Sequence, residues 1–394
     1  MPLPNFLPRQ TYRDTTIECV SSLIGFDTVS RNSNLALIEW AADRLGGHGA
    51  SVRLDYNEAR SKANLLATFG DGPGGVVLSG HTDVVPVDGQ VWQSDPFHAE
   101  IRDGQLYGRG ACDMKGFIGV VIAQAPTLGR VRLREPIHIA LSYDEEVGCL
   151  GIPGLIADMR DAGIQPSGCI VGEPTDMRVV SAHKGGRIYR CSVKGCAAHS
   201  SLTPSGVNAI EYAANVIAHI QRLAEKEART GPRIDGFDVP FSTVSTNTIQ
   251  GGSGMNIIPA DCEFSFEYRY LPGVAPDGFI DAVRTYATTQ IVPRMRERYG
   301  QAAIEFDCIG EIPALDDRDS AALQALAMGL LGETQSKAVA YGTEASFFNA
   351  VGVPSIVCGP GSISVAHKPD EHVSLSQLGT CEAFIRKLIL RAER

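Results

Sequence analysis

The sequence lacks several features that define common classes of protein. No apolar run is long enough to cross a bilayer, and residues 1–16 carry prolines and charges where an export signal has an apolar segment. Basic residues are also few, because 35 Lys and Arg face 45 Asp and Glu, for a formal net charge of -10. Phosphate binding needs a basic surface. We therefore expect a cytoplasmic protein with neither nucleic acid nor membrane among its partners.

Cysteine pairs are absent too. The chain has 10 cysteines, but no Cys-x-x-Cys pair occurs. Dispersed thiols in a chain without an export signal are typical of reduced, mostly buried side chains. Cys112 is adjacent to Asp113, and a cysteine beside a candidate metal ligand could be a reactive nucleophile. No histidine, however, occurs at a recognisable partner position. We interpret Cys112 as a small buried residue.

Nothing in the sequence indicates a nucleotide site. Glycine-rich segments occur at residues 70–75 and 108–110, yet neither completes a dinucleotide fingerprint and opens a crossover helix with an acidic residue at the expected distance. The sequence does have size and apolar content, with 394 residues of which 44% are hydrophobic. That is enough for large cores and for more than one domain.

Histidines and carboxylates recur in a few short segments that share a distinctive local setting. These segments are residues 78–86, 107–116, 144–148, 172–175 and 366–369. Three apolar runs that predict strands are each followed within a few residues by candidate ligands. Residues 76–78 precede His81, residues 137–141 precede Glu145 and Glu146, and residues 169–171 precede Glu173. Because ligands gather outside the carboxyl ends of strands in open α/β sheets, these runs and the ligands after them predict a single site.

The residue types suit a site with two metal ions. On an extended segment His81 and Asp83 project to the same side, so the Asp can accept from one imidazole nitrogen while the other nitrogen binds a metal. The two oxygens of Asp113 can bridge two cations about 3.5 to 4 Å apart. The adjacent acids Glu145 and Glu146 must diverge, so that one can bind metal while the other accepts a proton.

Ordinary structural roles compete with this interpretation. An isolated acidic pair such as Glu145 and Glu146 usually lies in a solvated loop, and His81 or His367 alone would more often be a structural histidine. The acidic pair, however, follows an apolar strand. The remaining histidines outside the motifs are interpreted as surface, loop or packing residues: His48, His98, His138, His183, His219 and His372.

The middle of the chain has a different pattern. It predicts strands at residues 187–194, 241–249, 260–270 and 303–307, with one helix opening at Ser205 and Gly206 and another at residues 276–296. This β-α-β-β-α-β order is that of a split βαβ domain. We predict a catalytic domain at 1–183 that continues at 313–394, ending in a helix at 376–391, and an inserted domain at 184–312.

The ordered motifs resemble the co-catalytic metallopeptidase family, which includes acetylornithine deacetylase, succinyl-diaminopimelate desuccinylase and aminoacylase. The resemblance covers essentially the whole chain and implies an α/β, zinc-peptidase-like catalytic domain, with a mixed central sheet flanked by helices. It also implies an inserted α+β, ferredoxin-like domain that serves as a lid and forms a homodimer. The resemblance assigns two divalent ions, zinc foremost with cobalt or manganese as alternatives. One is held by His81, Asp113 and Glu173, and the other by Asp113, Glu146 and His367.

The same resemblance implies roles for other residues. Asp83 would orient His81, Glu145 would be the general base, and the peptide bond after Asp113 would be cis. His199 resembles the lid histidine that reaches the partner subunit's site and steadies the oxyanion. The expected substrate contacts are Asn256, Arg269, Gly342 and Thr343, although Arg269 could instead form an ion pair on its strand.

Within the family, residues 341–345, 358–362 and 366–371 most resemble the acetylornithine branch, since the desuccinylase version of the first loop, with serine and aspartate, is absent. The small-molecule substrate expected is N2-acetyl-ornithine, with a succinylated or another acylated amino acid as the alternative. We hypothesise that Glu344 reads the substrate ammonium; bracing the loop is the competing role. A non-catalytic binding protein on this fold is disfavoured because every ligand and the base are present.

Overall fold

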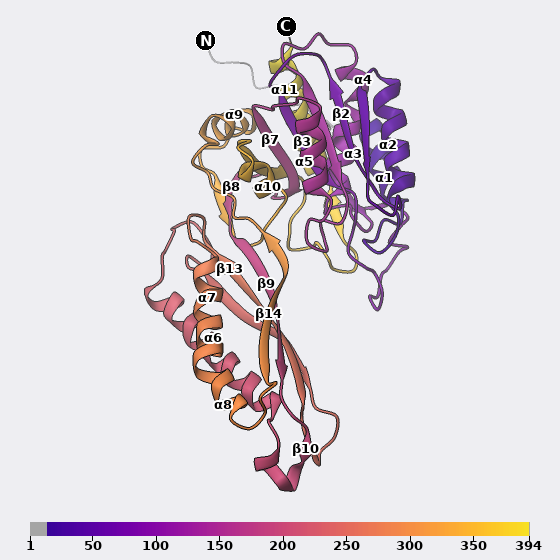
Figure 1. Ribbon diagram of the computed structural model, residues 1–394. Helices are drawn as coiled ribbons and strands as arrows, with labels where there is room; N and C mark the ends of the chain where they lie inside the picture. Colours follow the sequence, from indigo (N-terminus) through magenta and orange to yellow (C-terminus); the bar gives the residue numbers. More distant parts are fainter. Residues whose placement is uncertain (1–13, 394) are drawn as a thin grey trace. The chain divides into compact units, whose positions relative to one another are not determined.

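The computed structural model describes residues 14–393, which form two compact units (Figure 1). The larger unit contains residues 14–182, 315–337 and 343–393, and the smaller unit contains 183–314 and 338–342. In Figure 1 the indigo-to-magenta first part and the yellow C-terminal part share the larger unit. The inserted domain was expected at 184–312. The smaller unit starts one residue earlier and ends two residues later, and it also contains residues 338–342, which were expected in the catalytic domain. Residues 1–13, which carry most of the segment examined for an export signal, lie outside the described residues.

The larger unit contains nearly all of a mixed eight-stranded sheet. In spatial order its strands are β1 (Ser51–Tyr56), β2 (Ala63–Phe69), β6 (Ile137–Ser142), β3 (Val76–His81), β7 (Gly168–Pro174), β16 (Ser355–Gly359), β8 (Val180–His183) and β15 (Lys337–Val339). The central strands β6, β3, β7 and β16 run parallel to their neighbours in this group. Strands covered on both faces are nearly continuous apolar runs, and every residue of β6, β7 and β16 is buried.

Helices cover both faces of this sheet. They are α1 (Asp14–Ile24), α2 (Leu35–Gly47), α3 (Lys115–Ala123), α4 (Ala125–Leu128), α5 (Ile152–Asp161), α9 (Ala321–Leu331), α10 (Ala345–Ala350) and α11 (Leu375–Ala392). Helices α1, α2, α9 and α11 pack with α3 around the main core of the unit, whereas α5 and α10 contact each other and the sheet. This arrangement confirms the predicted mixed sheet flanked by helices. The last helix is one residue longer at each end than predicted.

Close packing of α3 sets the position of the segment before it. A Cβ atom at Gly172 of β7 would lie 1.9 Å from the Phe117 ring, and one at Gly80 of β3 would lie 2.8 Å from the Met114 side chain. Glycine at these two positions lets α3 approach the sheet closely. The residues just before α3, Asp113 among them, are therefore held beside the ends of β3 and β7.

A small second sheet joins two distant segments of the larger unit. Its strands are β17 (His372–Ser374), β5 (Gln105–Tyr107) and β4 (Glu100–Arg102). His372 pairs with Tyr107 in an antiparallel register. Consequently the end of the loop before β17 lies next to the start of the loop after β5.

The smaller unit has a four-stranded antiparallel sheet in the order β11 (Thr243–Gly251), β13 (Asp261–Tyr270), β9 (Gly185–Lys194), β14 (Ala303–Ile312). Its helices are α6 (Ala209–Thr230), α7 (Asp277–Tyr286) and α8 (Val292–Arg296), the last two joined by a π turn at Ala287–Ile291. Short segments β10 (Ala198–His199), β12 (Ile257–Ile258) and a 3-10 turn (Ser200–Ser205) complete it. The element sequence follows the predicted β-α-β-β-α-β order.

Helix α6 begins later than predicted. Its first residue is Ala209, and the Asn208 side chain accepts hydrogen bonds from the backbone N–H groups of Ile210 and Glu211. Such a side chain satisfies N–H groups that have no partner within the helix. The predicted start at Ser205 and Gly206 was therefore wrong, because the cap is the asparagine three residues later than the serine. No helix among residues 14–393 is both long and apolar enough to cross a membrane.

Candidate metal centre

The candidate site lies in the larger unit, where several strand ends and two loops meet. His81 is the last residue of β3 and pairs in register with Ser142, the last residue of β6. Glu173 is on β7, next to β3 in the sheet. Asp113 precedes α3, and His367 lies in the loop between β16 and β17. The strand ends that the sequence predicted to share a site are therefore neighbours.

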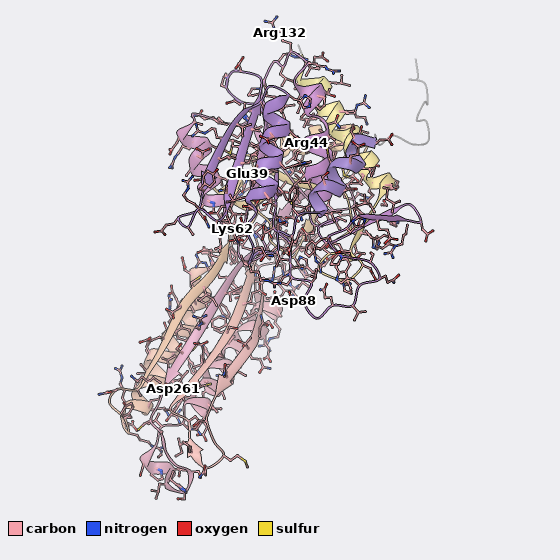
Figure 2. All side chains as sticks on the ribbon, turned by 90° about the vertical axis from the view of Figure 1, so that its right-hand side faces the viewer. Glu39, Arg44, Lys62, Asp88, Arg132 and Asp261 are labelled. Carbon is pink, nitrogen blue, oxygen red and sulfur yellow. The ribbon has the colours of Figure 1, made fainter. Side chains whose placement is uncertain are left out.

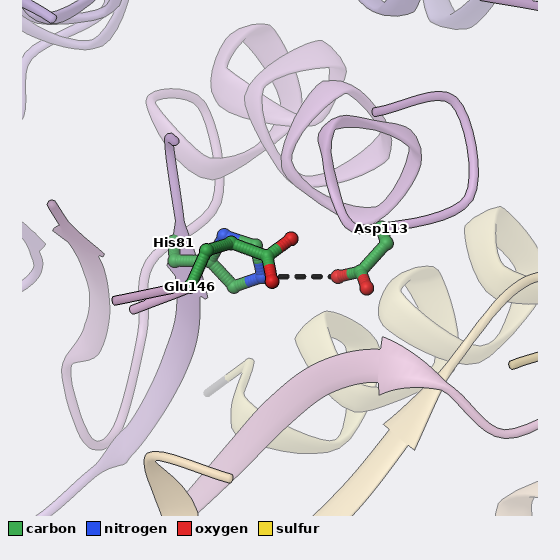
Figure 3. Close-up of side chains that lie close together, drawn as sticks. All are labelled: His81, Asp113 and Glu146. Carbon is green, nitrogen blue, oxygen red and sulfur yellow. Dashed lines mark hydrogen bonds and ion pairs between the residues drawn. The ribbon is translucent and has the colours of Figure 1, made fainter. Parts of the chain in front are cut away.

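One group of side chains surrounds His81, and Figure 3 shows two of its members, His81 and Asp113, together with Glu146. Its Nε2 atom lies 3.0 Å from Asp113 Oδ1 and 3.4 Å from Glu173 Oε1. All three side chains are buried. An imidazole nitrogen and two carboxylate oxygens thus converge on one small volume at the strand ends.

A second group surrounds His367. Its Nε2 atom lies 3.2 Å from Asp113 Oδ2 and 3.0 Å from Glu146 Oε2. Asp113 therefore directs one oxygen toward His81 and the other toward His367. This is the placement expected of a carboxylate shared between two cations.

Asp83 holds the acidic loop more directly than it holds the histidine. The Nδ1 atom of His81 hydrogen-bonds to the backbone oxygen of Asp83 at 2.9 Å, while the Asp83 Oδ1 atom is 3.6 Å away. The Asp83 carboxylate accepts from the backbone N–H groups of Glu145 and Glu146, at 3.0 and 3.2 Å. It also accepts from the Ser30 hydroxyl at 2.7 Å. The hydrogen bond predicted between His81 and the Asp83 carboxylate is thus made to the Asp83 backbone carbonyl. The Asp83 side chain instead orients the loop that carries Glu145 and Glu146.

Glu145 and Glu146 diverge as their adjacent positions require. Glu146 faces His367, whereas an oxygen of Glu145 lies within 4.8 Å of ligand atoms of both His81 and Glu173. The backbone turns sharply just before them, with Asp144 at a φ of 57°. Lys62, in the larger unit (Figure 2), anchors this turn through hydrogen bonds to the Asp144 carboxylate and the Ser30 carbonyl.

Crowding of carboxylates perturbs proton binding throughout the site. Burial, with the neighbouring Asp113 charge, raises the pKa of Glu173 to about 8. Burial also raises the pKa of Glu145 well above its ordinary value. For Asp113 burial acts in the same direction, but hydrogen bonds from His367 and His81 outweigh it and lower its pKa. Displacements of this size mark sites where charge is concentrated for chemistry or ion binding.

The donor set fits divalent cations. Among the described residues, two groups place one donor atom from each member within 4.8 Å of the others: His81 with Asp113 and Glu146, and His81 with Glu145 and Glu173. The buried Oε1 atom of Glu173 makes no hydrogen bond of normal geometry with a described residue, and His81 Nε2 lies 3.4 Å from it. A buried carboxylate oxygen that is incompletely hydrogen-bonded is costly unless a cation binds it. Imidazole and carboxylate donors of this kind are ligands of zinc and related ions.

Two further predictions about the Asp113 segment can be compared with the structure. The peptide bond between Asp113 and Met114 is cis, as the resemblance implied. Cys112 is 1% exposed, and burial, with the Glu371 and Asp113 charges, raises the pKa of its thiol. A thiol held in the neutral form is a poor nucleophile, in agreement with its interpretation as a buried packing residue.

Glu344 lies in the interior of the larger unit. The residue immediately precedes α10 and is fully buried, with 0% exposure. Neither of its oxygens makes a hydrogen bond of normal geometry with a described residue. Burial raises its pKa to about 7, and the neighbouring Ser142 hydroxyl opposes this shift. Contact with a substrate ammonium and bracing of the loop both stay predictions for Glu344. Thr343, also buried, belongs to the same segment.

The remaining residues predicted to contact substrate belong to the smaller unit. His199 is exposed in β10, and its Nδ1 atom lies 2.8 Å from the Ser201 hydroxyl. Asn256 is exposed in the loop before β12. Arg269 forms an ion pair at 2.8 Å with Glu267 on the same strand and donates to the Ala340 carbonyl. The strand ion pair considered as an alternative for Arg269 is therefore present, and the substrate roles of these residues and of Gly342 stay predictions.

Sequence reasoning assigned no role to Arg109 or Glu371. Both lie in segments that carry ligands, and both are fully buried as an ion pair of 2.7 Å. Buried charges are usually paired. The sequence shows only that a basic and an acidic residue occur in two segments that carry ligands. It does not show that the two residues pair, because the pairing depends on the tertiary fold.

The fold and this arrangement of ligands are those of a metal-dependent hydrolase acting on amides. Residues 77–391 match the model of Peptidase family M20/M25/M40, and the chain belongs to this family. The acetylornithine deacetylase of Pasteurella multocida is 35% identical over 381 residues, which cover 95% of this chain and 97% of that protein.

Solved structures show the same fold at lower identity. A tripeptidase from Staphylococcus aureus superposes with a TM-score of 0.74 at 19% identity, covering 96% of this chain and 98% of that one. A Bacillus subtilis protein described as a dinuclear metal-binding peptidase of the same family gives a TM-score of 0.67 at 15% identity, covering 96% and 98%. These similarities establish the architecture but assign no substrate to this chain.

Proposed function

We propose that the protein removes the Nα-acetyl group of N2-acetyl-L-ornithine, giving L-ornithine and acetate, and that it serves arginine biosynthesis. The observation that carries the proposal is the similarity to acetylornithine deacetylases over nearly the full length of both chains. The convergent ligand set of the larger unit supports it, because a hydrolase of this class needs every one of those side chains.

Two divalent ions, zinc foremost and cobalt as an alternative, are proposed as cofactors. His81, Asp113 and Glu173 would hold one, and Asp113, Glu146 and His367 would hold the other. When bound, such ions make a water more acidic and stabilise negative charge on a carbonyl oxygen.

Glu145 is proposed to move the proton. It lies beside the ligands, and Asp83 holds its backbone N–H group. As the water oxygen bonds to the acetyl carbonyl carbon, Glu145 accepts the water proton. It returns that proton to the amine nitrogen as the C–N bond breaks, so that acetate and the free amino group leave. Burial raises the pKa of Glu145 above its ordinary value, which strengthens the carboxylate as a proton acceptor.

Substrate binding is proposed to involve the smaller unit of a homodimer. His199 of one copy would donate to the developing oxyanion in the partner's site. Arg269 and Asn256 would bind the substrate α-carboxylate, and Gly342 and Thr343 would form the loop that closes over it. To bind the substrate carboxylate, Arg269 would have to break its ion pair with Glu267.

A panel of acylated amino acids tests this function. The metal-loaded protein should hydrolyse N2-acetyl-ornithine with the highest kcat/KM, measured beside acetyl-citrulline, acetyl-methionine and succinyl-diaminopimelate. Faster cleavage of the succinylated substrate would move the protein to desuccinylation. No hydrolysis of any member by protein with two bound ions would favour a binding protein on this fold.

A further inference from the structure

The buried carboxylate of Glu371 joins the two loops that carry Asp113 and His367. Its Oε1 atom accepts hydrogen bonds from the backbone N–H groups of Cys112 and Asp113, each at 2.9 Å. Its Oε2 atom accepts from Arg109 Nη1 at 2.7 Å. Both side chains of this ion pair are 1% exposed. The carboxylate therefore holds the backbone of Asp113, whose side-chain oxygens face His81 and His367.

Arg109 extends the connection to His367. Its Nη2 atom donates to Gln90 Oε1 at 2.5 Å, and the Gln90 Nε2 atom donates to the His367 carbonyl at 3.0 Å. Arg109 Nη1 also donates to the Lys368 carbonyl at 3.2 Å. The Trp92 ring lies under the guanidinium, 4.9 Å away, and its N–H donates to Gln90. His367 and its neighbour are thus fixed through their backbone atoms.

The two proposed metal sites differ in what supports them. His81 and Glu173 are on strands in the middle of the eight-stranded sheet, where neighbouring strands fix their positions. His367 lies in a loop at a φ of 64°, a conformation that L-residues rarely adopt without support. A site with a loop ligand depends on the contacts that hold the loop, whereas a site on strand ends has the sheet as its frame.

We infer that Glu371, Arg109 and Gln90 are positioning residues for the metal site of Asp113, Glu146 and His367. They touch no ligand atom; they hold the backbone on both sides of that site. This inference rests on the proposed metal centre. It states that Glu371, Arg109 and Gln90 raise the metal affinity of the His367 site in particular. A buried ion pair that only contributed to folding would have no such preference.

Two variants test the inference. Glu371→Gln keeps an oxygen for the backbone N–H groups but turns an NH2 group toward Arg109. Gln90→Leu removes the link to His367 and leaves the buried ion pair intact, so it stays informative if the first variant fails to fold. Gln93→Leu, in the same loop with an exposed side chain, is the matched control.

The measurement is zinc binding by chelator-stripped protein, followed by calorimetry and by competition with a chromogenic chelator. Wild type and Gln93→Leu should bind two ions. Gln90→Leu should bind the first ion with unchanged affinity and the second about 10 to 100 times more weakly, the usual effect of removing support from a metal ligand. Glu371→Gln also loosens the shared Asp113, so it should weaken both ions, the second more than the first. Asp113→Ala should weaken both.

Other outcomes separate the possible failures. Two ions bound with unchanged affinity by both network variants would overturn the inference and leave the proposed function standing. Equal weakening of both ions, together with a lower Tm, would show a general structural role and would also overturn it. Fewer than two ions on wild-type protein would contradict the metal centre itself.

Discussion

A single aspartate organises the acids at the centre of the site. Because the Asp83 carboxylate accepts from the backbone of both Glu145 and Glu146, it fixes the direction in which each glutamate leaves the chain. Lys62 fixes the turn before them. The two glutamates are therefore separated in function by backbone geometry, and only one of them faces His367.

The first prediction concerns Glu145. Glu145→Gln should retain both metal ions, because the amide keeps the shape of the side chain and the ligands are unchanged. It should lower kcat by about two to four powers of ten, the usual contribution of general acid-base catalysis. Metal analysis and steady-state kinetics on the same preparation measure both effects. Turnover equal to that of wild type would assign the proton to another residue.

The second prediction concerns Glu344, whose burial should make the metal-stripped protein less stable as the pH rises toward 7. Its pKa is about 7 when folded and about 4.3 in an unfolded chain. Between these values the folded state keeps a proton that the unfolded state has released, so the free energy of unfolding falls as pH rises to about 7. Above that pH the buried charge persists, and Glu344→Gln should be more stable than wild type.

Urea unfolding at about pH 5 and about pH 8 measures this difference. Glu39→Gln, at an exposed helical position labelled in Figure 2, is the matched control and should follow wild type at both values. Parallel pH curves for Glu344→Gln and wild type would contradict the prediction. The variant should also lose similar kcat/KM on acetyl-ornithine and acetyl-methionine if Glu344 braces the loop, whereas a selective loss on acetyl-ornithine would restore a substrate contact.

At the scale of secondary structure, local pattern predicted much of what is observed. Apolar runs before His81 and Glu173 predicted strands, and the structure shows these strands to be buried and parallel to each other. Alternation marked β9, which is buried at every second residue along much of its length. The spatial order of the strands and the pairing of β17 with β5 were not predicted, because they depend on contacts between distant segments. The Arg109 and Glu371 pair was missed for the same reason.

Asn208 gives a prediction for helix α6. Its side chain caps the helix, so Asn208→Ala should lower the free energy of unfolding by about 0.5 to 2 kcal/mol. Asn215→Ala, an exposed position within the same helix, is the control and should be neutral or slightly stabilising because alanine has the higher helix propensity. Denaturant unfolding of both variants decides between the cap and a general effect of removing asparagine.

At the scale of the whole molecule, the proposed dimer predicts complementation between two inactive variants. His199→Ala and Glu145→Gln subunits, mixed under exchange conditions, would form hybrid dimers in which one of the two sites has both groups intact. Random exchange makes half of the dimers hybrid, so about one quarter of wild-type activity should return. No recovery despite proven exchange would place His199 in the site of its own chain or in a structural role.

The position of β16 has a consequence for biosynthesis. This strand comes from the last part of the chain yet lies between β7 and β8, and His367 follows it. On the ribosome, the contiguous residues 183–314 of the smaller unit emerge before the larger unit can close its sheet. Until β16 arrives, the edges of β7 and β8 have no partner there, and unpaired apolar edges invite association with other chains. A nascent chain therefore carries these unpaired edges until residues 355–359 have been made.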